Sequence, residues 1–109
     1  MTPYYLNKKG NKVSISITKH ARERYRERFN LLSPENKIEN HEVEASIARY
    51  FNTSNRLKNL GKHDLERMER YGQDTMFFRK NEWTFVVQNC QIVTCEISLK
   101  NNRHLNKKG

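Results

Sequence analysis

The chain has few of the residues on which common small catalytic motifs depend. Its 109 residues include four glycines, two prolines and two cysteines. Because the glycines are scattered, no glycine-rich loop is present to cradle phosphate groups, and no Gly-x-Ser-x-Gly turn carries a serine nucleophile. No apolar run is long enough to span a membrane and no signal peptide is recognisable. We therefore expect no membrane partner.

The two cysteines, Cys90 and Cys95, are poorly spaced for a disulfide or a zinc site. A separation of five residues on one strand places their side chains on opposite faces, which disfavours a bridge. The histidines His41, His63 and His104 lack partners at ligand spacing. We expect free thiols in a reducing cytoplasm, no metal site and no cofactor.

Acidic residues are outnumbered, and the imbalance is uneven along the chain. Lys and Arg total 21 against 12 Asp and Glu, which gives a net charge of +9. Residues 1–28 carry eight basic and two acidic side chains. Residues 35–48 carry one basic and four acidic side chains, and residues 100–109 carry four basic side chains and no acidic one. Basic ends around an acidic middle favour a polyanionic partner, most commonly a nucleic acid. The alternative is that the charge serves only solubility.

The length suits a single domain. We expect a flexible basic lead-in over residues 1–12, one domain over 13–99 and a disordered basic tail over 100–109. Alternation over residues 13–18 predicts one half-buried strand. Thr18 is the natural N-cap of a helix that runs to about Phe29.

Further elements follow in the order helix, helix, then three strands. Ser33-Pro34-Glu35 predicts a second helix start, and this helix ends near Asn52. A short helix over 63–71 stops at Gly72. Strand-like runs then occupy 75–79, 83–88 and 91–98. The pattern predicts an α+β fold: an N-terminal strand, two to three helices and a three-stranded antiparallel meander, forming one sheet with the helices on one face.

In the last strand, alternation predicts that two sets of side chains face opposite sides. Val93, Cys95 and Ile97 are expected to face the core. Ile92, Thr94 and Glu96 are expected to share the other side.

The most informative stretch is the first predicted helix. His20, Arg24 and Arg28 recur every four residues and form one stripe, beside a second stripe that begins with Ala21 and Tyr25 and can face a core. Guanidinium groups can bind two phosphate oxygens each, and an imidazole titrates near neutrality. This stripe is our candidate catalytic centre for phosphodiester chemistry. The alternatives are a surface histidine and an arginine that bridges helix to sheet.

Other residues could complete such a site. Thr94 and Glu96, on the outward side of the last strand, are candidate catalytic partners, with Glu96 as a second proton carrier or as the group that orients His20. Lys19 is a candidate nucleic-acid contact. A second group of nucleic-acid contacts is expected at one hairpin, where an indole could stack on a base: Arg79, Lys80 and Trp83. The alternatives are ordinary strand polarity for Glu96 and a buried Trp83. Arg22 and Arg26 are expected to form surface ion pairs.

A resemblance to a known family rests on two segments. The run from Ile17 to Arg28 contains His-Ala-x-x-Arg-x-x-x-Arg, and it is followed much later by Phe85-Val86-Val87 and Ile92-Val93-Thr94. This arrangement is similar to small bacterial and phage domains of the BrnT and RelE toxin type, within the barnase–colicin–RelE class of ribonuclease folds. The resemblance implies ribonuclease activity carried by His20 and Arg24, then by Arg28 and Thr94. The chain departs from the pattern at Phe29, where such domains often have glycine, and in extra helical sequence over 53–74.

Two functions follow from these observations. The first is a metal-independent endoribonuclease of toxin type, with RNA as its substrate and an antitoxin or host protein as a possible partner. The second is a non-catalytic inhibitor of phage or mobile-element origin that binds nucleic acid or protein. A DNA-binding regulator ranks last, because no helix-turn-helix spacing is present.

Overall fold

The structure, a computed structural model, describes residues 2–97, with His63 described by its backbone alone. It confirms the predicted α+β class, with three helices and two sheets. Ser98 and the expected basic tail over 100–109 lie outside the described residues. The elements, in chain order, are β1 Tyr4–Leu6, β2 Lys12–Ser14, β3 Ser16–Ile17, α1 Lys19–Leu32, α2 Asn40–Asn52, β4 Asn55–Arg56, α3 Lys62–Tyr71, β5 Met76–Lys80, β6 Trp83–Gln88 and β7 Gln91–Ile97.

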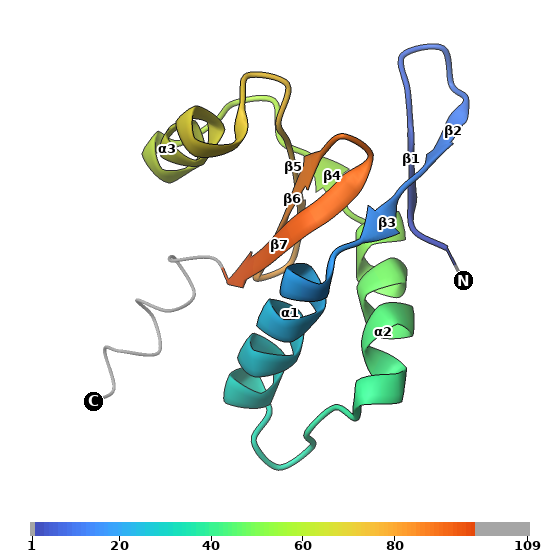
Figure 1. Cartoon of the computed structure of the whole chain (residues 1–109), viewed down its shortest axis with the longest axis vertical. Coiled ribbons are helices and arrows are strands. Elements are labelled where there is room, and N and C mark those ends of the chain that lie inside the picture. The colour runs from blue at the N-terminus through green and yellow to red at the C-terminus, as the bar shows by residue number, and fades with distance from the viewer. Residues whose placement is uncertain (1, 98–109) are drawn as a thin grey trace.

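The main sheet has five strands in the order β3-β7-β6-β5-β4. The three long strands β5, β6 and β7 form the predicted antiparallel meander, connected by tight turns. β3 pairs in parallel with the start of β7, and the short β4 adds an antiparallel edge beside β5 that the sequence did not predict. Figure 1 shows α1 and α2 at one end of the molecule and α3 at the other.

The N-terminal strand predicted over residues 13–18 is divided between two sheets. β2 pairs with β1 in a separate hairpin, whereas β3 joins β7 in the main sheet. The chain passes from one sheet to the other at Ile15, whose backbone N–H donates to the Pro3 carbonyl at 3.1 Å. The expected lead-in over 1–12 therefore contains β1, which is tied to α2 because the Tyr4 N–H donates to Asn52 Oδ1 at 2.9 Å.

Helix α1 begins where the sequence predicted and ends later. The Thr18 hydroxyl accepts a hydrogen bond from the Ala21 N–H at 3.1 Å, which confirms the N-cap. The helix continues past Phe29 to Leu32. Its apolar stripe is anchored by Ala21 and Tyr25, both fully buried.

The start predicted for the second helix is wrong. Ser33 instead ends α1, and its carbonyl accepts from the Asn36 N–H in a tight turn. α2 begins at Asn40 after Glu39, whose side chain forms a reciprocal capping box with Glu42. Glu39 takes the N-cap position that was expected of Ser33, so the helix starts six residues later than predicted.

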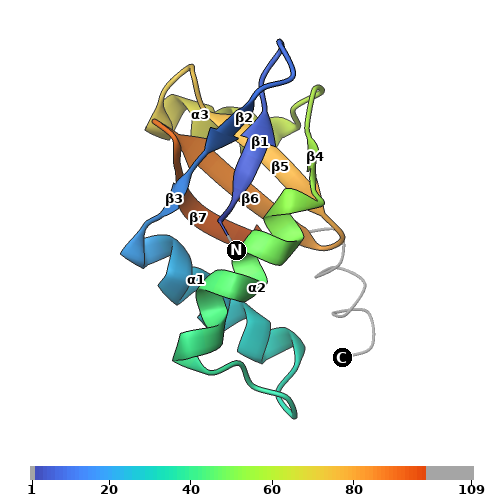
Figure 2. The same cartoon turned by 90° about the vertical axis from the view of Figure 1, so that its right-hand side faces the viewer.

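The expectation that all helices cover one face of the sheet is also wrong. α1 and α2 bury one face, whereas α3 lies on the other, as Figures 1 and 2 show together. The side chain of Gln88, which points away from the core-facing Val87, donates to the Tyr71 carbonyl at the end of α3. The Gly72 that follows has φ 122° and stops the helix as predicted.

The alternation predicted for the last strand is interrupted by a β-bulge. Val87 pairs with Ile92 but Val86 pairs with Thr94, so Val93 is left as the extra residue. Ile92 consequently belongs to the same buried cluster as Cys95. The prediction that Ile92 faces the same side as Thr94 and Glu96 is therefore wrong. After the bulge, the side chains from Thr94 onward alternate as predicted.

Candidate functional site

A polar groove of about 360 Å³ lies where α1, β7 and α3 meet. Five of its lining residues are those that the sequence analysis chose as catalytic candidates, and they come from two elements far apart in the chain. α3 adds four more, which the sequence analysis did not choose. The lining residues are His20, Arg24, Arg28, Glu66, Arg67, Arg70, Tyr71, Thr94 and Glu96.

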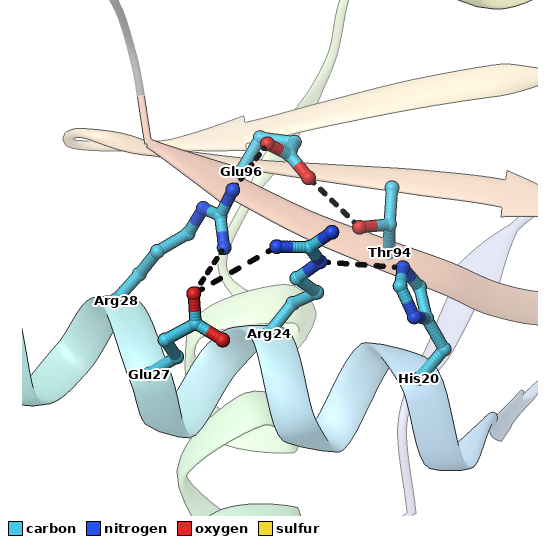
Figure 3. A network of polar contacts seen from close by, with 6 residues as sticks. All are labelled: His20, Arg24, Glu27, Arg28, Thr94 and Glu96. Atoms are coloured by element: carbon cyan, nitrogen blue, oxygen red, sulfur yellow. Dashed lines mark hydrogen bonds and ion pairs between the residues drawn. The ribbon is translucent and has the colours of Figure 1, made fainter.

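His20 and Arg24 contact each other along the α1 stripe. The Arg24 Nε–H donates to His20 Nε2 at 3.4 Å, and Arg24 Nη1 lies 3.7 Å from Glu27 Oε1 (Figure 3). Because His20 Nε2 accepts this bond, it is the ring nitrogen without a proton in this arrangement. Both side chains reach solvent: His20 is exposed, and 39% of the Arg24 side chain is accessible.

Arg28 is the arginine that bridges helix to sheet, one of the alternatives stated above. Its Nη2 donates to Glu96 Oε1 at 3.1 Å, and each of the two side chains is 21% exposed. The Thr94 hydroxyl donates to the other oxygen, Glu96 Oε2, at 2.9 Å. With both carboxylate oxygens engaged in this way, Glu96 holds Arg28 and Thr94 and does not orient His20 (Figure 3).

The contribution of α3 was missed by the sequence analysis. Arg67 and Arg70 are three residues apart on an amphipathic helix, a spacing that places them on one side and that the sequence does display. Arg67 is fixed by an ion pair at 3.1 Å to Asp64, which is 6% exposed. Nothing in the sequence alone places α3 opposite α1, because that depends on how residues 53–75 fold over the sheet.

Lys19 does not lie in this groove. Its side chain is 84% exposed and is 4.0 Å from Glu23 Oε1. It lines instead a separate groove between α1 and α2, together with Arg22 and Arg26. Arg22 pairs with Glu44 at 3.1 Å, as expected of a surface ion pair.

The hairpin residues are also set apart from the groove. Trp83 is 2% exposed and stacks on Tyr25 with ring centroids 4.3 Å apart, so the expectation that it stacks on a base is wrong. Trp83 is buried because the apolar stripe of α1 covers this end of β6. Arg79 is exposed, and its Nε donates to Thr84 Oγ1 at 3.4 Å. Neither Arg79 nor Lys80 lines the groove.

Both cysteines are free, as expected, and they differ in environment. Cys90 is exposed in the β6–β7 turn, whereas Cys95 is buried behind Thr94 and Glu96 on the core face of β7. Burial raises the pKa of the Cys95 thiol well above its usual value, and the neighbouring Glu96 carboxylate adds to the shift. A thiol held neutral is a poor nucleophile, so the chemistry of this site falls to the groups that line the groove.

Comparisons with known proteins give no relative: no family model, no curated protein and no solved structure matches the chain. Within residues 2–97, no three or more His, Cys, Asp or Glu side chains gather as a possible metal site. None of the three helices found there is both long and apolar enough to cross a bilayer. The groove is therefore the feature of the molecule that points to a function.

Proposed function

We propose that the protein is a metal-independent endoribonuclease of toxin type, which cleaves RNA in the groove between α1, β7 and α3. The observation that carries the proposal is that His20 and Arg24 stand side by side on one open groove, with further cations facing them from α3. An imidazole and a guanidinium at one place are the groups that this reaction needs. The resemblance of the first helix to the BrnT and RelE toxin domains supports the same activity.

In the proposed reaction, the neutral His20 acts as the general base. Its Nε2 accepts the proton of a ribose 2′-hydroxyl, and the 2′-oxygen attacks the adjacent phosphorus. The bond from phosphorus to the 5′-oxygen breaks, and this oxygen leaves with a proton taken from solvent. The products are a 2′,3′-cyclic phosphate and a 5′-hydroxyl end.

Arg24 supplies positive charge to the reacting phosphate. Its guanidinium already lies within 3.4 Å of His20 Nε2, so a phosphate that binds Arg24 is held beside the base. Binding the phosphate would also draw the Arg24 Nε–H away from Nε2, which frees the lone pair that accepts the proton. Arg24 is partly neutralised by Glu27 at 3.7 Å, a contact exposed enough to be exchanged for a phosphate.

The test is cleavage by purified protein in the presence of a chelator. A mixed-sequence RNA and the DNA of the same sequence are incubated with the protein and EDTA, and the product ends are identified by mass spectrometry. We expect RNA fragments that end in 2′,3′-cyclic phosphate, with the DNA intact because it lacks the 2′-hydroxyl. Intact RNA, or equal cleavage of the RNA and the DNA, contradicts the proposal.

The second function, a non-catalytic binding protein, gives a different result in the same experiment. Such a protein retains RNA or DNA in a salt-dependent complex without cutting either. Retention without cleavage would therefore replace the first proposal by the second.

A further inference from the structure

The groove is lined by four arginines, and they are not equally available to an anion. They are Arg24, Arg28, Arg67 and Arg70, and two acidic residues line the same groove. A cation already paired with a carboxylate must lose that partner before it can bind a phosphate, so the pairing of each arginine decides what it can do.

Arg28 and Arg67 are the two that are firmly paired. Arg28 Nη2 donates to Glu96 Oε1 at 3.1 Å, and its Nη1 lies 3.9 Å from Glu27 Oε1. Arg28 Nη1 is buried and has no hydrogen-bond partner, so it does not present itself to the groove. Arg67 donates to Asp64 at 3.1 Å.

Arg70 is the exception. It lies in the last turn of α3 and is exposed, and among residues 2–97 it has no ion pair with a carboxylate. It lines the wall of the groove opposite the α1 stripe, and α3 is fastened to the sheet next to it by the bond from Gln88 to the Tyr71 carbonyl. The position is therefore fixed by the fold, and within residues 2–97 no carboxylate forms an ion pair with this guanidinium.

We infer that α3 forms the second wall of a binding groove for single-stranded RNA and that Arg70 is its principal phosphate contact, whereas Arg28 is a positioning residue. The inference deepens the proposed function and rests on it for the identity of the strand. It places a bound phosphodiester between Arg24 on one wall and Arg70 on the other. Arg28 keeps Glu96 and Thr94 in place beneath the bound phosphodiester.

The experiment measures binding separately from cleavage. The probe is a short RNA with 2′-O-methyl riboses, which cannot be cut, and its dissociation constant is followed across a series of salt concentrations. Removing one phosphate contact from a single-stranded complex lowers the slope of log affinity against log salt by about 0.7. We expect Arg70→Ala to weaken binding roughly tenfold or more, as for loss of a charge-assisted hydrogen bond, and to lower the slope by about that amount.

Two further variants sharpen the result. Arg70→Lys keeps the charge and loses the planar fork, so it should retain the slope while recovering only part of the affinity. Arg26→Ala is the matched control, since it removes an exposed arginine from the other groove beside α1. Equal affinities and slopes for Arg70→Ala and Arg26→Ala would overturn the inference, and so would a slope lowered more by Arg28→Gln than by Arg70→Ala.

The outcomes also separate this inference from the proposed function. If ordinary RNA is not cleaved but the uncut probe binds through Arg70, the proposed activity fails and the groove remains a binding site. If RNA is cleaved and Arg70→Ala binds as the wild type does, the activity stands and the assignment of Arg70 fails. If ordinary RNA is not cleaved and the probe does not bind, both fail.

Discussion

Helix α1 borders two grooves of opposite character, although it supplies arginines to both. On the β7 side, His20, Arg24 and Arg28 meet residues from two other elements in a polar groove of about 360 Å³. On the α2 side, a groove of about 520 Å³ contains Lys19, Arg22 and Arg26 among exposed acidic side chains. The helix carries four arginines and two glutamates, and both glutamates, Glu23 and Glu27, line the α2-side groove and not the β7-side groove. The two sides therefore differ in the charge that α1 presents, and also in the sheet and α3, which line the β7 side only.

The largest difference between the two grooves should appear in catalysis. Replacing a general base costs on the order of 100-fold to 10,000-fold in rate. We expect His20→Ala to reduce single-turnover RNA cleavage by about 100-fold or more, measured with saturating protein. Lys19→Ala, one residue away on the other side of α1, should change the cleavage rate by less than about threefold, because the ammonium group of Lys19 is solvated and its side chain is 84% exposed. Comparable losses in the two variants would show that the grooves do not differ in function.

A second difference should appear in stability, since on each side of α1 one of its arginines forms an ion pair at 3.1 Å. In the Arg28–Glu96 pair both side chains are 21% exposed, whereas in the Arg22–Glu44 pair they are 39% and 63% exposed. We expect Glu96→Gln to lower the free energy of unfolding by about 1–2 kcal/mol, because a partly buried guanidinium loses its charged partner. Glu44→Gln should cost about 0.5 kcal/mol or less.

Urea unfolding of the two variants, followed by circular dichroism, gives this comparison directly. Arg28→Gln combined with Glu96→Gln tests whether the effect belongs to the pair, since the double variant should lose less than the sum of the two single losses. Additive losses would mean that Arg28 and Glu96 stabilise the fold independently and that the bridge is not what holds the β7 side together.

A smaller effect should appear at alkaline pH on the core side of β7. Burial raises the pKa of Cys95 above its usual 9.0, so the folded protein holds this proton more tightly than the unfolded chain. The corresponding stability is fully present below pH 9 and is lost as the pH rises above it, by about 1.4 kcal/mol per pH unit for one proton. Cys95→Val should therefore reduce the fall in stability between pH 9 and 10. Buried Tyr25, whose pKa is likewise raised by burial, contributes chiefly above pH 10.

The measurement is urea unfolding at a series of pH values for wild type and Cys95→Val. An equal slope in the two proteins would show that the thiol does not titrate with unfolding. Cys90→Ser is the control, because it replaces the exposed thiol of the β6–β7 turn and leaves Cys95 in place.

The sequence predicted the local structure well wherever a short-range signal was strong. Thr18 marks the start of α1, Gly72 marks the end of α3, and the alternating aromatic and β-branched residues of β5 to β7 predict the meander. Boundaries that depend on tertiary packing were wrong. Ser33-Pro34 is a good helix start on its own, but α1 continues to Leu32 and uses Ser33 to end.

For the candidate site, the helical stripe and the outward positions of β7 were predictable from periodicity. His20, Arg24 and Arg28 needed only the spacing of four, and Thr94 and Glu96 needed only the period of two. The opposite wall was not predictable, because the position of α3 is set by how residues 53–75 fold over the sheet and by a contact from Gln88 to a backbone carbonyl. The burial of Trp83 was likewise decided by a partner from α1, and hydrophobic periodicity does not identify partners.

The most direct test of the account is to ask which of the two grooves binds RNA. Isotope-labelled protein is titrated with the 2′-O-methyl RNA, and the NMR shifts of the arginine Nε–H groups and the His20 ring are followed. The account predicts that His20, Arg24 and Arg70 shift together and saturate at one concentration, while Arg22 and Arg26 stay in place. Shifts confined to Arg22 and Arg26, or spread equally over both sides of α1, would contradict it.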